Sequence, residues 1–98
     1  MAFIDMYDFE LLVNEAEKLV IDELEKQLEG RGKDLCVCND CVVDMAAVAL
    51  NAVKPLYRFS LLGSLYAAQA MNEASYAEGV RKAVSSAIEK VRKNPSHD

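Results

Sequence analysis

Between residues 7 and 29, apolar residues recur at steps of three and four, and charged residues fill most positions between them. This period is typical of an amphipathic α-helix, and Asp8 is placed to cap its first turn. The apolar positions are Phe9, Leu12, Ala16, Leu19, Val20, Leu24 and Leu28. We therefore predict one helix over residues 7–29, ended by Gly30 and Gly32, because glycine suits the turn that follows a helix.

Two later segments also have helical character. The first follows Asn39 and Asp40, either of which can cap it, and should run to about Val53, because Pro55 disfavours helical geometry in the residue before it. Its residues are apolar on nearly every side, which predicts a central helix covered by its neighbours or by a second subunit. The second segment, residues 72–93, carries one apolar stripe and ends in basic residues that suit a helix C terminus.

The connection between these two helices has a different pattern. Apolar and polar residues alternate over residues 57–61, which is the period of a strand, and Gly63-Ser64 suits a tight turn. We expect a short β-hairpin or an irregular connector in residues 54–70. The sequence thus predicts a mainly all-α fold, a single domain over residues 1–98 with three helices arranged up, down and up.

Composition excludes several classes of protein. The chain has 98 residues, of which 52% are hydrophobic, so it is not a disordered chain. A net charge of −5 argues against direct DNA binding, which requires clustered lysine and arginine. Neither a signal peptide nor an apolar run of about 20 residues is visible, and we expect a cytoplasmic protein without membrane insertion. No nucleophile and base pair is evident, so we do not expect an enzyme.

Three cysteines form the pattern C-x-C-x-x-C immediately before the central helix. Cys41 falls in the first turn of that helix, where backbone amides favour a thiolate. An up, down and up arrangement returns the end of the last helix to the cysteines, and the single histidine, His97, follows that helix. Cys36, Cys38, Cys41 and His97 would supply the four sulfur and nitrogen ligands that zinc prefers.

Alternatives to this ligand set are open. The fourth ligand in place of the histidine is Asp40, Asp44, a water molecule or a side chain of another subunit. Without a metal, the cysteines are buried or redox-reactive thiols, and the chain would be a thiol redox sensor.

The sequence resembles one family over nearly its whole length. The similarity lies, in the same order along the chain, in residues 20–24, the cysteine cluster at 36–41, residues 44–51, the Pro-Leu-Tyr at 55–57 and the Asn-Pro-Ser-His at 94–97. The most specific part is the C-x-C-x-x-C pattern followed by A-x-A-L-N and then P-x-Y. These motifs are similar to those of the late competence development protein ComFB family.

The resemblance implies a small, mainly helical cytosolic protein that dimerises and holds zinc through its cysteines. It also implies a competence-related role, and some cyanobacterial members bind cyclic dinucleotide second messengers. We therefore predict a zinc-binding homodimer that acts as a regulatory or protein-interaction module, with another regulatory protein as a partner. The alternative is a receptor for c-di-GMP or c-di-AMP, in which Tyr57, Arg58 and Phe59 of both chains would contact the bases and phosphates.

Overall fold

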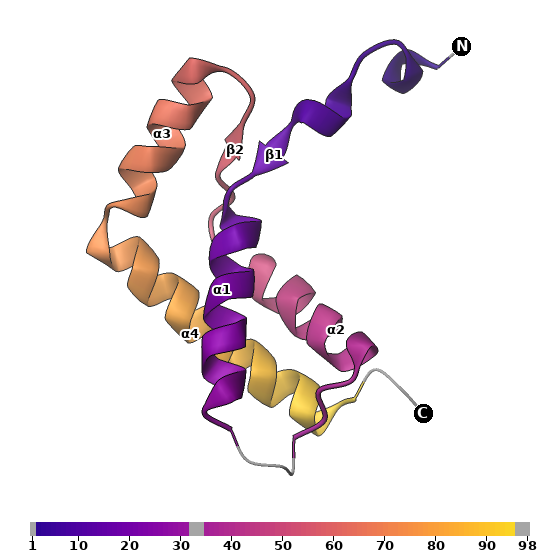
Figure 1. Cartoon of the computed structure of the whole chain (residues 1–98), viewed down its shortest axis with the longest axis vertical. Helices are drawn as coiled ribbons and strands as arrows, with labels where there is room; N and C mark the ends of the chain where they lie inside the picture. Colours follow the sequence, from indigo (N-terminus) through magenta and orange to yellow (C-terminus); the bar gives the residue numbers. More distant parts are fainter. Residues whose placement is uncertain (1, 32–34, 96–98) are drawn as a thin grey trace.

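The computed structural model describes residues 2–31 and 35–95. Within these residues the fold is mainly helical, with four α-helices and one two-stranded antiparallel sheet (Figure 1). The elements are η1 (Phe3–Asp5) and η2 (Phe9–Leu11), both 3-10 helices, then β1 (Val13–Asn14), α1 (Ala16–Glu29), α2 (Asn39–Leu50), β2 (Tyr57–Arg58), α3 (Leu61–Met71) and α4 (Ala74–Lys93). The molecule is flat, measuring 45 × 39 × 17 Å.

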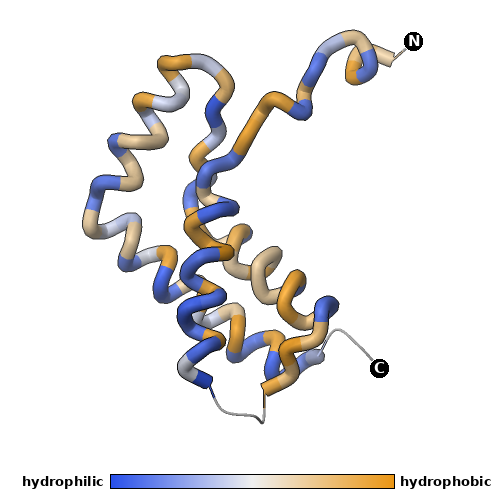
Figure 2. Tube along the Cα trace, viewed as in Figure 1, coloured by the Kyte–Doolittle hydropathy of each residue, from blue (hydrophilic) through white to orange (hydrophobic). Residues whose placement is uncertain are grey.

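The helices α1, α2 and α4 pack against one another and enclose the main core. On α2 the buried residues Cys41, Met45 and Ala49 follow each other at intervals of four, so a single stripe of that helix faces inward. Ile88 of α4 is completely buried within the same core. Figure 2 shows polar and apolar positions mixed along α1, whereas α2 is apolar over most of its length.

The predicted helix over residues 7–29 is right only for its second half. Asn14 interrupts it: its Oδ1 accepts hydrogen bonds from the backbone N–H of Ala16 at 3.1 Å and of Leu56 at 2.8 Å. The first of these bonds caps the start of α1, and the second holds the chain beside β2. Residues 13–14 are therefore extended, and the preceding residues form a separate segment with no buried residue in η1 or η2.

The predicted hairpin between the second and third helices is wrong. Residues 57–58 do form a strand, but its partner is β1, with Val13 opposite Arg58 and Asn14 opposite Tyr57. Ser60 then caps α3, since its Oγ accepts a hydrogen bond from the N–H of Gly63 at 3.4 Å. The alanines and leucines that follow favour a helix over a strand, because they lose little conformational freedom in it. Hence the prediction of three helices arranged up, down and up is corrected to four, and the last begins at Ala74.

Candidate metal centre

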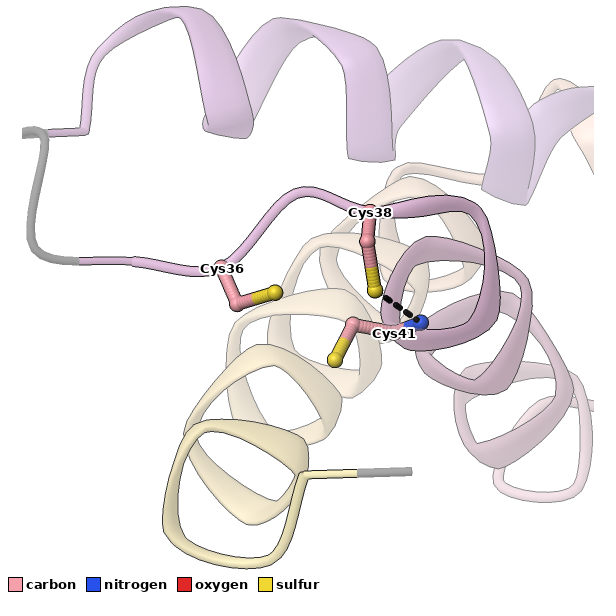
Figure 3. Close-up of side chains that lie close together, drawn as sticks. All are labelled: Cys36, Cys38 and Cys41. Carbon is pink, nitrogen blue, oxygen red and sulfur yellow. Dashed lines mark hydrogen bonds between the residues drawn. The ribbon is translucent and has the colours of Figure 1, made fainter. Parts of the chain in front are cut away.

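The cysteine cluster is built at the N terminus of α2. Cys38 is the N-cap residue, and its Sγ accepts a hydrogen bond from the backbone N–H of Cys41 at 3.4 Å. Capping by a sulfur atom at this position brings the sulfurs of both residues to the first turn of the helix. Cys36 approaches from the preceding loop, and Figure 3 shows the three sulfur atoms gathered around one space.

The distances between the sulfur atoms suit one metal ion. All three Sγ atoms lie within 4.8 Å of one another. Tetrahedral zinc with Zn–S bonds of about 2.3 Å places its sulfur ligands about 3.8 Å apart, so small side-chain rotations would close the site. Cys41 is buried, and Cys36 and Cys38 lie on the exposed side. A metal held here would join the loop, α2 and the core.

The carboxyl end of α4 reaches this cluster. A cavity of about 140 Å³ is lined by residues of the cysteine loop and α2 together with Val91, Arg92 and Pro95. The predicted return of the last helix to the cysteines is thus confirmed. His97 itself lies outside the described residues.

Other candidate ligands stand apart from the cysteines. Among the described residues, no aspartate, glutamate or histidine joins the three sulfurs in a group that would hold a metal. Asp40 and Asp44 line a different hollow on α2, together with Val43. Neither therefore completes the cysteine set in this structure.

An ion-pair network fixes the helix ends beside the site. Glu89 of α4 accepts hydrogen bonds from Arg92 on the same helix and from Arg31 just beyond α1, the latter at 2.9 Å. The bond from Arg92 and then that from Arg31 hold the pKa of Glu89 below its usual range. The network ties the end of α1 to α4, on either side of the cysteine loop.

The residues predicted to contact a nucleotide lie elsewhere, on and after β2. Arg58 donates a hydrogen bond from Nε to Glu15, so its guanidinium already forms an ion pair. Tyr57 is exposed, and Phe59 lines an apolar groove with Tyr7 and other residues of the amino-terminal segment. These three residues do not meet the cysteines.

A large exposed apolar surface lies outside the three packed helices, and it confirms the expectation that the connector offers apolar surface a monomer would leave in water. We call residues 3–14 and 57–71 the projecting region, because Figure 1 shows both stretches extending beyond the three packed helices. Its large exposed side chains include Phe3, Ile4, Tyr7, Phe9, Leu11, Leu12, Tyr57, Phe59, Leu61, Leu62, Leu65 and Tyr66. The sequence signal for the second of these stretches is that residues 59–72 contain no charged residue at all.

Within the described part of the chain, no helix combines the length and the hydrophobicity that crossing a bilayer would require.

A family model described as "Late competence development protein ComFB" matches residues 13–95. No curated protein matches the chain. The chain is also similar to a solved structure described as "Structural characterization of the late competence protein ComFB from Bacillus subtilis", with a TM-score of 0.68 and 22% identity, over 87% of this chain and 92% of that one. At this identity the structural match supports the fold alone.

Proposed function

The chain belongs to the ComFB family, and from this premise we propose that it is a zinc-stabilised helical homodimer. In this proposal it acts as a regulatory or protein-interaction module, competence-related by family, and not as an enzyme. The observation that carries the zinc assignment is the cluster of three sulfur atoms at the start of α2.

The chemistry of the donors favours zinc among the metals. Three thiolates are soft ligands, which select zinc over magnesium or calcium, and a structural zinc site requires a fourth sulfur, nitrogen or oxygen ligand. We assign that position to His97, because α4 ends at the cavity beside the cysteines and Pro95, two residues before the histidine, lines it. Zinc would supply a cross-link between the loop, α2 and the carboxyl end of the chain.

The exposed surface supports a second copy as a partner. The chain exposes 7144 Å², whereas a compact monomer of 10.8 kDa exposes about 5,500 Å². The radius of gyration is 15.6 Å, compared with about 13 Å for a compact domain of about this length. A typical interface removes about 800 Å² from each partner, so association through the projecting region would account for about half of this excess.

Two measurements on the purified protein test the proposal. Native mass spectrometry should find one zinc ion per chain, and light scattering should give about 22 kDa, twice the chain mass of 10.8 kDa. His97→Ala should weaken zinc binding without changing the oligomeric state. A metal-free protein would contradict the zinc assignment, and a monomer would contradict the dimer.

The cyclic-dinucleotide receptor has one observation in its favour, the exposed rings of Tyr57 and Phe59 on either side of Arg58. Against it, Glu15 already neutralises the one guanidinium of this segment. Calorimetric titration with c-di-GMP and c-di-AMP separates the two functions. Micromolar binding that Arg58→Ala abolishes would favour the receptor, and no heat with either ligand would favour the interaction module.

A further inference from the structure

A second apolar surface lies far from the projecting region, between α1, the cysteine loop and the start of α2. It is a groove of about 500 Å³ lined by Ile21, Glu25, Leu28, Glu29, Val37 and Val42. We propose that this groove binds a short basic and apolar peptide segment of a partner protein, and that the metal at the cysteines holds the groove in its binding shape. This inference rests on the proposed function, since it names the partner surface of that interaction module.

The groove offers apolar anchoring to a peptide. Ile21 is 54% exposed and Val37 is 61% exposed, although both are large aliphatic side chains at opposite walls. Leu28 and Val42, which also line the groove, are partly buried and pack against the main core. A volume of this size accommodates a few aliphatic side chains of a peptide, which is how apolar grooves bind amphipathic segments.

The charge of the groove selects the partner. Both charged residues in its lining, Glu25 and Glu29, are acidic and lie four residues apart on one face of α1. In the described residues neither forms an ion pair. Two like charges at this spacing repel each other, and a cation placed between them would relieve the repulsion. Lysine or arginine beside an aliphatic residue is therefore the complementary partner chemistry.

The same charge argues against a second copy of this chain in the groove. A two-fold interface pairs a surface with itself, so it would bring the acidic residues of both copies into one interface. The projecting region carries no such conflict over residues 59–71, which are uncharged. The two apolar surfaces thus have different partners.

The metal couples to the groove through Val37. This residue stands between Cys36 and Cys38 in the sequence, and its side chain forms the loop side of the groove. A metal bound by both cysteines fixes the backbone on either side of Val37. Without the metal, the loop loses that constraint and the groove loses one wall.

The test uses the zinc-loaded dimer and a fluorescein-labelled amphipathic peptide of leucine, lysine and alanine, followed by fluorescence anisotropy. Glu25→Lys combined with Glu29→Lys should weaken binding by at least about ten-fold, because like charges then meet. The same variant should bind a matched peptide in which glutamate replaces every lysine. Glu17→Lys, on an exposed position of α1 outside the groove, is the matched control and should change binding less than about two-fold.

Two further arms separate this inference from its alternatives. Val37→Asp should abolish peptide binding but leave both the zinc content and the dimer unchanged. In the unmodified protein, chelation of the zinc should weaken peptide binding. The inference is overturned if the basic peptide does not bind, if charge reversal has no effect, or if Val37→Asp produces a monomer. That last outcome would assign the groove to the interface between copies. The zinc content and the mass from light scattering are measured separately, and they test the proposed zinc-binding homodimer.

Discussion

The packed helices α1, α2 and α4 and the projecting region of residues 3–14 and 57–71 are two differently built parts of one small chain. The packed helices bury Val20, Val84 and Ile88 completely. In α3, by contrast, Ala67 is the one residue of that helix that is buried, and the leucines of the same helix are largely exposed. One part is stabilised by its own interior, and the other has most of its apolar surface in water.

This difference indicates how the two parts gain stability. An isolated helix shorter than about 12 residues is marginal in water, and α3 has 11 residues. Burial against other helices, the capping bonds of Asn14 on α1 and Cys38 on α2, and the proposed metal support the packed part. The projecting region is supported by its cap at Ser60, the short sheet, the Glu15–Arg58 ion pair and the small cluster in which Ala67 packs with Ala16 and Leu56. The proposed second copy would add further burial.

The largest effect is expected when the packed part loses its proposed metal. Cys41→Ser should lose the zinc and destabilise the fold by about 3 kcal/mol or more, because the ligand is buried and metal binding contributes to folding. At about 4–8 °C per kcal/mol, the melting temperature should fall by more than about 10 °C. The unmodified protein in a chelator is the control and should melt like the variant. Equal melting of the variant and the zinc-loaded protein would contradict a structural metal.

The next effect compares the two parts directly. Ile88→Ala should cost about 2–5 kcal/mol in urea denaturation, because it leaves a cavity in the core. Leu62→Ala on α3 is the matched truncation of an exposed residue. Its effect should grow with protein concentration, since it acts through association, whereas that of Ile88→Ala should persist at every concentration. A concentration-independent loss for Leu62→Ala would mean that α3 is supported within one chain.

A smaller effect on folding, but a decisive one on assembly, is expected from Leu65→Asp. A carboxylate on the uncharged helix α3 would lose its hydration in an interface, so the dimer should dissociate to the 10.8 kDa chain in light scattering. Ile21→Asp places the same charge on a similarly exposed position of the acidic groove and should leave the dimer intact. If Ile21→Asp dissociates the dimer and Leu65→Asp does not, the interface between copies lies at the acidic groove and not at the projecting region.

The smallest effect concerns Glu89, which joins α1 and α4 beside the metal. The hydrogen bonds from Arg92 and then Arg31 lower its folded pKa, so its contribution to stability is present above the unfolded pKa of about 4.3. That contribution should be lost as the pH falls through the lowered folded pKa. The melting-temperature difference between the unmodified protein and Glu89→Gln should therefore shrink between neutral and acidic pH. Glu78→Gln, on the same helix, is the control.

The sequence by itself determined the parts of the fold that depend on neighbouring residues. Apolar residues at helical steps predicted the second half of α1, all of α2 and all of α4. The cysteine cluster was predicted because C-x-C-x-x-C spans the start of a helix, and within so short a span the backbone itself brings the three sulfurs together. The return of α4 to the cysteines followed from the order of the helices around a common core.

Only the tertiary structure decided where the first helix begins and which secondary structure the connector, residues 54–70, adopts. Residues 9 and 12 fit a helical period, yet Asn14 bonds to Leu56 across 42 positions and turns the preceding residues outward. Residues 57–58 have a strand pattern whichever partner they pair with, and the partner is β1. The exposure of α3 also depends on distant contacts, because its composition is equally typical of a buried helix. Local periodicity shows which residues are apolar. What packs against them depends on residues far along the chain or in another molecule.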